Sequence, residues 1–117
     1  MAEVTFAGYA ALWDRVDRAG DVFRRGTFAA GEVALLRDHR GEPIGRVAVR
    51  EDERGLLVEG AGDGVRVGDG LSVGFRALRT RQGARREILS VALVEVSVVR
   101  VPMQPGARVE RVFNKGE

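Results

Sequence analysis

The segment Arg86–Val101 constrains the fold of this chain more than any other stretch. Side chains alternate across a strand, so its even and odd positions would lie on opposite faces. Both sets are mostly apolar: one holds Ile88, Ser90, Ala92, Val94, Val96 and Val98, and the other Leu89, Val91, Leu93, Glu95, Ser97 and Val99. We therefore expect a central strand that is buried on both faces. Glu95 is the one carboxylate between Ile88 and Val99, and a buried charge is costly unless it has a partner.

The rest of the sequence alternates short β-prone runs with turn residues, a pattern typical of an all-β domain. The expected strands are Val4–Leu12, Val33–His39, Ile44–Glu51, Leu56–Ala61 and Leu71–Leu78, with turns at 14–21, 41–43, 52–55 and 80–85. Arg24–Gly31 is a candidate short helix. The glycine-rich segment Gly60–Gly70 is expected to be a loop that is either flexible or constrained in its backbone.

We find no internal repeat and no linker, so residues 1–117 form one expected domain. The pattern predicts a mainly β fold. More closely, it predicts a closed or partly open β-barrel of about six to seven strands with one or two short peripheral helices.

Composition excludes several classes of function. The 117 residues include no cysteine and one histidine, which excludes disulfides and thiolate sites and argues against zinc. We therefore expect no cofactor and no metal. No apolar run is long enough for a transmembrane helix, and the N-terminus lacks the pattern of a secretory signal. The expected compartment is the cytoplasm, with no membrane partner.

The charge pattern gives little support to nucleic-acid binding. The net charge is only +2, and arginines alternate with acidic residues over most of the chain. The one basic cluster, which runs from Arg76 to Arg86, would be the surface of a small nucleic-acid-binding barrel. One Trp and one Tyr offer little area for stacking on bases, so nucleic acid is the weakest of the alternatives.

Ser72 lies in the pattern Gly70-Leu71-Ser72-Val73-Gly74, which matches the nucleophile elbow of the α/β-hydrolases. Two observations argue against that fold. Its histidine follows the serine, whereas His39, the only histidine here, precedes Ser72. The residues after Gly74 alternate apolar and basic, so they continue a strand instead of opening a helix. A nucleophilic Ser72 would therefore belong to a different architecture.

Three residues could form a catalytic set, because a serine nucleophile needs a nearby base and a third group that orients the base. His39 is the candidate base, Ser72 the nucleophile, and Glu95 a carboxylate in need of a partner. Each also has an ordinary structural explanation. His39 would be a surface residue, Ser72 a turn residue between glycines, and Glu95 the ion-pair partner of Arg86 or Arg100. The spacing alone leaves both explanations open.

Five blocks of the sequence, in a fixed order, carry a resemblance to a known family. They are Phe6–Trp13 with Asp17, Gly20-Asp21-Val22 and Arg25–Phe28; Val33–His39; Pro43–Gly45 with Glu51–Leu56; Gly70–Phe75; and Leu93–Val99 with Pro102 and Pro105–Val109. Together they resemble the prohead (procapsid maturation) serine proteases of tailed bacteriophages and their gene-transfer-agent relatives. That family's fold is similar to the herpesvirus assemblins, so the resemblance implies a closed β-barrel with peripheral helices.

The resemblance also implies a function. It implies a serine endopeptidase that acts inside the immature capsid, in the bacterial host, and trims segments of scaffold and major capsid protein. By resemblance, His39 is the base and Ser72 the nucleophile. Glu95 is the expected third member because it is the acidic residue of the closing block, and Ser97 is the next candidate. The expected partners are those substrates, and a homo-oligomer is left open.

The chain departs from the family pattern in three places. Only the segment Gly60–Gly70 stands where the family carries a helical insertion, and Arg40 follows His39 where an acidic residue is common. We also expect no scaffold-like extension after Val109. These departures leave an alternative: a catalytically weak or inactive capsid-assembly or scaffolding module on the same barrel.

Overall fold

The computed structural model describes residues 2–114, and every regular element in that range is a β-strand. The strands are β1 (Glu3–Leu12), β2 (Asp21–Phe23), β3 (Gly31–Arg37), β4 (Arg40–Glu51), β5 (Gly55–Asp63), β6 (Gly70–Gln82), β7 (Arg86–Val99) and β8 (Val109–Asn114). All eight belong to one sheet, so the expectation of a mainly β fold is confirmed.

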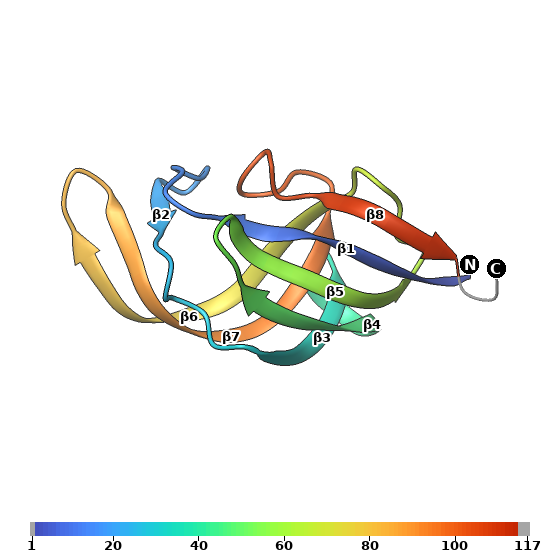
Figure 1. The fold of residues 1–117 in the computed structure, drawn as a ribbon. Helices are drawn as coiled ribbons and strands as arrows, with labels where there is room; N and C mark the ends of the chain where they lie inside the picture. The colour runs from blue at the N-terminus through green and yellow to red at the C-terminus, as the bar shows by residue number, and fades with distance from the viewer. Residues whose placement is uncertain (1, 115–117) are drawn as a thin grey trace.

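Strand β7 is the centre of the sheet, as its two apolar faces predict. It pairs with β6 along one edge, and on its other edge it meets β2 at its start and β3 at its end. The order then continues β3-β4-β5-β1-β8 (Figure 1). The sheet curls but does not close. Strand β6 approaches the segment before β8 only at the isolated bridge between Gly70 and Arg108, so the fold is partly open.

The expected peripheral helix at Arg24–Gly31 is wrong, and no helix occurs anywhere between residues 2 and 114. The backbone of this segment forms hydrogen bonds with residues of β7. The backbone N–H of Arg24 donates to Ile88, and the Thr27 carbonyl accepts from Val91. The Thr27 hydroxyl also donates to the Ile88 carbonyl. These bonds replace the i to i−4 bonds of a helix and hold the segment against β7.

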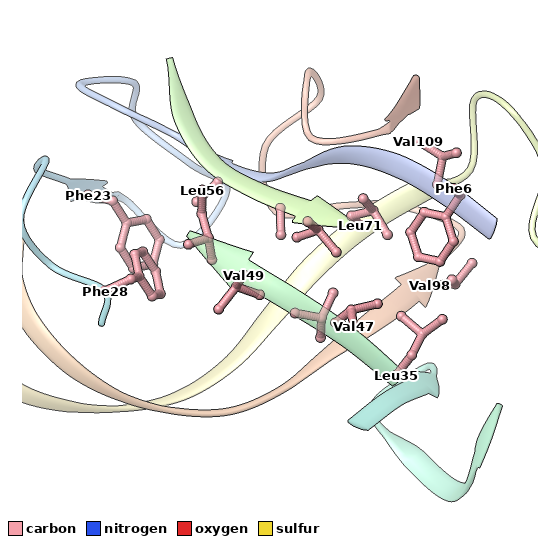
Figure 2. Close-up of a cluster of buried hydrophobic side chains, with 14 of the residues drawn as sticks. Phe6, Phe23, Phe28, Leu35, Val47, Val49, Leu56, Leu71, Val98 and Val109 are labelled. Carbon is pink, nitrogen blue, oxygen red and sulfur yellow. The ribbon is translucent and has the colours of Figure 1, made fainter. Parts of the chain in front are cut away.

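The core lies between the inner face of the β6–β7 pair and the strands β1, β4 and β5. Phe23 and Phe28 pack at one end of this core, while Phe6 and Leu35 fill the other end (Figure 2). In β7 both faces are buried only from Glu95 to Val98. Toward Arg86 the hairpin of β6 and β7 reaches past the β1–β5–β4 layer (Figure 1), while Ile88 and Val91 of β7 stay buried in the core. A β-bulge between Leu93 and Glu95 turns Val94 outward, with 63% of its surface exposed.

The glycine-rich segment Gly60–Gly70 is constrained in its backbone. Its first four residues belong to β5, where a side-chain carbon on Gly60 would lie 2.3 Å from the Arg46 carbonyl oxygen. The remaining loop buries Val65 and is tied down by a bond from the Gly68 N–H to the Val109 carbonyl. Gly60 and Gly70 are therefore sites where two strands approach closely.

Candidate functional site

His39 lies in the two-residue turn that joins β3 to β4. Arg37 pairs with Arg40, and both turn residues have positive φ, 55° at Asp38 and 62° at His39. Positive φ at both positions is the geometry of a type I′ hairpin turn, and Asp and His tolerate that region better than most residues. The expected turn at 41–43 is therefore wrong, because β4 already begins at Arg40.

The turn places the His39 imidazole against the carboxylate of Glu95 on β7. The distance from Nδ1 to Oε1 is 2.6 Å. The side chain of Glu95 is 9% exposed and that of His39 is 42% exposed. A carboxylate can only accept, so Nδ1 carries the hydrogen of this bond, and in a neutral ring Nε2, the other ring nitrogen, keeps its lone pair. The carboxylate thus has the partner that its burial requires, and the imidazole has a basic nitrogen on its other side.

Ser72 lies on β6, directly opposite Ser97 of β7, and Gly74 lies opposite Glu95. These four residues share the outer face of the β6–β7 pair, because Leu71, Val96 and Val98 alternate with them and belong to the core. The backbone N–H of His39 donates to Ser97 Oγ over 2.9 Å. His39 and Ser72 therefore lie on either side of Ser97.

The glycines around Ser72 have steric roles in a sheet, which differ from those of a nucleophile elbow. A side-chain carbon on Gly74 would lie 2.2 Å from Glu95 Oε1, the oxygen that bonds His39. A carbon on Gly70 would lie 2.7 Å from the carbonyl oxygen of Val99. Gly70 therefore admits a neighbouring backbone, and Gly74 leaves the space that the Glu95 carboxylate fills.

No hydrogen bond joins His39 and Ser72 in the structure. Ser72 is 5% exposed and its Oγ has no hydrogen-bond partner among residues 2–114. Every fully buried polar side-chain atom in that range has a partner, so the Ser72 hydroxyl keeps some contact with solvent. Catalytic hydrogen bonds of this kind are often loose before substrate binds.

A hollow of about 360 Å³ lies at the rim of the sheet, lined by sequence neighbours of the candidate residues and not by those residues themselves. Its lining includes Asp38, which precedes His39; Gly70, two residues before Ser72; and Val98, which follows Ser97. Three arginines also line it: Arg37, Arg100 and Arg108. The hollow therefore adjoins all three strands that supply the site.

The structure also bears on metal binding, on membrane-spanning helices and on the basic cluster. Within the described range, no group of three or more His, Cys, Asp or Glu side chains is arranged to hold a metal, and no helix could span a membrane. In the basic cluster, Arg81 pairs with Glu87 and Arg86 pairs with Asp21. These ion pairs reduce the charge that the cluster could offer to phosphates.

Sequence reasoning missed two contributors to the site. The sequence pattern offers Ser97 only as a replacement for Glu95, whereas the structure bonds it to both Glu95 and His39. It presents Gly74 only as part of a motif. The signal for both was strand spacing, because residues 95 and 97 must share a face, as must 72 and 74.

A buried carboxylate bonded to a half-exposed imidazole, beside a serine that reaches solvent, is the residue set that serine hydrolases use. The family model described as caudovirus prohead serine protease matches residues 1–117, the whole chain. The chain belongs to this family of phage serine peptidases. No curated protein and no solved structure gives a significant match.

Proposed function

We propose that this chain is the serine endopeptidase of phage-type capsid maturation, with Ser72 as nucleophile, His39 as base and Glu95 as the group that orients the base. The family supports a capsid-maturation peptidase acting inside the procapsid in the host. The observation that carries the residue roles is the 2.6 Å contact between His39 Nδ1 and Glu95 Oε1, one strand away from Ser72.

The proposed reaction is acyl transfer in two steps. Ser72 Oγ attacks the scissile carbonyl carbon while its proton passes to His39 Nε2, and Glu95 stabilises the imidazolium through Nδ1–H. The same proton then goes to the leaving amine as the peptide bond breaks, which leaves an acyl ester on Ser72. Water, deprotonated by His39, hydrolyses this ester and restores the serine hydroxyl.

The proposed substrates are segments of the major capsid protein and of scaffold. The hollow at the rim adjoins both Gly70 and Asp38, so a peptide whose carbonyl lay at Ser72 could place a neighbouring side chain there. Its three arginines and two aspartates, Asp38 and Asp69, would favour a polar or charged side chain over an apolar one.

A fluorophosphonate probe tests this proposal because it forms a covalent bond with an activated serine. We expect mass spectrometry of the labelled chain to place the adduct on Ser72, and Ser72→Ala to remove it. Glu95→Gln should keep the fold, since glutamine has the same shape, but should lower the labelling rate by about 100-fold or more, because an amide orients the imidazole poorly.

Co-expression with the major capsid protein of the same phage provides the second measurement. We expect a shortened capsid protein with the wild-type chain and full-length protein with Ser72→Ala. A folded wild-type chain that neither takes the probe nor shortens the capsid protein would overturn the proposal and would favour the assembly-module alternative. An adduct on Ser97, with Glu95→Gln fully active, would reassign the residues.

A further inference from the structure

Among residues 2–114, Ser97 is the one residue whose side chain hydrogen-bonds both His39 and Glu95. Its Oγ accepts a hydrogen bond from the His39 backbone N–H and donates one to Glu95 Oε2, each at 2.9 Å. The residue is fully buried, with 0% of its surface exposed. It lies in the middle of the outer face, with Leu36 of β3 on one side and Ser72 of β6 on the other.

The directions of these bonds follow from elementary chemistry. A backbone N–H can only donate and a carboxylate can only accept, so the single hydroxyl hydrogen of Ser97 is committed to Glu95. Two serines face each other across β6 and β7, and of these two only Ser72 has a hydroxyl that donates no hydrogen bond within residues 2–114. Ser97 is therefore a poor candidate for the nucleophile, because its proton is already held by a buried acceptor.

The two bonds fix different parts of the pair. The bond to the His39 N–H anchors the backbone of a turn whose residues both have positive φ. The bond to Glu95 Oε2 occupies one carboxylate oxygen and leaves Oε1 for the His39 ring. Side chains that lock catalytic groups in this way matter because a misplacement of about 1 Å can cost about 100-fold in rate.

We propose that Ser97 is a positioning residue that fixes His39 and Glu95 relative to each other and holds the imidazole in the tautomer with hydrogen on Nδ1. This inference rests on the proposed function, because it assigns a role within the same site. It adds a fourth residue that never touches substrate and acts only through His39 and Glu95.

The test compares Ser97→Ala with Ser90→Ala. Ser90 lies seven residues earlier on the same strand and is partly buried, whereas Ser97 is fully buried, so Ser90→Ala makes the same chemical change away from the pair. We expect Ser97→Ala to lower the rate of fluorophosphonate labelling at Ser72 by about 10- to 100-fold. Ser90→Ala should label at the wild-type rate. Ser97→Cys, which keeps the volume and offers only a weak donor, should fall between Ser97→Ala and wild type.

A spectroscopic readout separates positioning from a general loss of stability. His39 is the only histidine, so the ¹⁵N spectrum of histidine-labelled protein reports on it alone. In the wild-type chain we expect a protonated Nδ1 and an unprotonated Nε2 when the ring is neutral. In folded Ser97→Ala, or in Ser97→Cys if the alanine variant fails to fold, we expect a mixture of tautomers. This readout needs no turnover, so it tests the inference even if the wild-type chain fails to react with the probe.

Three results would overturn the inference. One is a folded Ser97→Ala chain that labels at the wild-type rate. Another is slow labelling with an unchanged histidine spectrum, which would mean that the loss arises elsewhere. A probe adduct on Ser97 itself would also contradict it, because a buried hydroxyl that already donates to Glu95 should not react with the probe.

Discussion

At Gly74 the absence of a side chain makes room for the contact between Glu95 and His39. The space above this residue holds the Glu95 carboxylate oxygen that bonds His39. A methyl group there would meet the flexible end of a side chain, not backbone, so the fold can adjust. The adjustment must move the carboxylate away from the imidazole, and the pair would then lose its geometry.

We therefore expect Gly74→Ala to keep the fold but to slow labelling of Ser72 by about 10- to 100-fold. Gly31→Ala is the matched control, because a side-chain carbon at Gly31 meets nothing within 4 Å and its φ is ordinary. Thermal melting and the labelling rate of both variants check the prediction. Equal labelling rates in the two variants would contradict it.

For the candidate site, the sequence indicated the need of Glu95 for a partner but not the position of the turn that carries His39. The need of Glu95 for a partner followed from one charge in an apolar strand. The His39 turn could not be placed, because Gly41 and Pro43 are stronger turn residues than Asp38 and His39. Pairing of β4 with β3, which ends at the Arg37–Arg40 pair, overrode that local preference and carried the strand back to Arg40.

The β6–β7 hairpin is the element that supplies both Ser72 and Glu95, and its far end is secured by charge. Glu87 of β7 bonds Arg81 of β6 and Arg24, which follows β2. Arg81, and then Arg24, lowers the pKa of Glu87 from its usual 4.5 to about 2. This carboxylate thus links three segments of the chain.

The lowered pKa gives a pH dependence whose sign can be worked out. The unfolded chain binds the Glu87 proton at a higher pH than the folded chain does. The stabilisation is therefore present above about pH 4.5 and is lost as the pH falls toward about 2. We expect Glu87→Gln to show a shallower decline of unfolding free energy across that window than wild type. Urea denaturation at several pH values measures this, and parallel declines would contradict it.

Strand content was easier to predict than the connections between strands. Alternating apolar residues identified most strands, but Arg24–Gly31 has no pattern that distinguishes a helix from an extended segment held by β7. Its carbonyl and N–H partners, Ile88 and Val91, lie about sixty residues away in the sequence. Local patterns do not report on such distant partners.

Across the whole molecule, stability depends on one curled sheet packed against itself, since residues 2–114 contain no helix to cover a face. Leu56 of β5 lies in the middle of this core with no exposed surface. Leu78, on the hairpin, is 60% exposed. The same residue type thus occurs at the two extremes of burial.

We expect Leu56→Ala to lower the free energy of unfolding by about 2–5 kcal/mol, because it removes packed atoms and leaves a cavity. Leu78→Ala should change it by less than about 0.5 kcal/mol, as is usual for an exposed side chain. Urea denaturation of both variants checks the pair. Similar losses in the two would mean that the hairpin packs against something that the isolated chain does not show.

The parallel contact between β3 and β7 also bears on when the proposed peptidase activity could begin. It joins only Leu35–Arg37 to Val96–Val98, and the bond from His39 to Glu95 that depends on it spans 56 positions in the sequence. Contacts between such distant segments pay the entropy of closing a long loop. A chain that has not yet closed this loop holds Ser72 and His39 without the pairing to Glu95, so under the proposed roles the speed of folding sets the earliest moment of proteolysis.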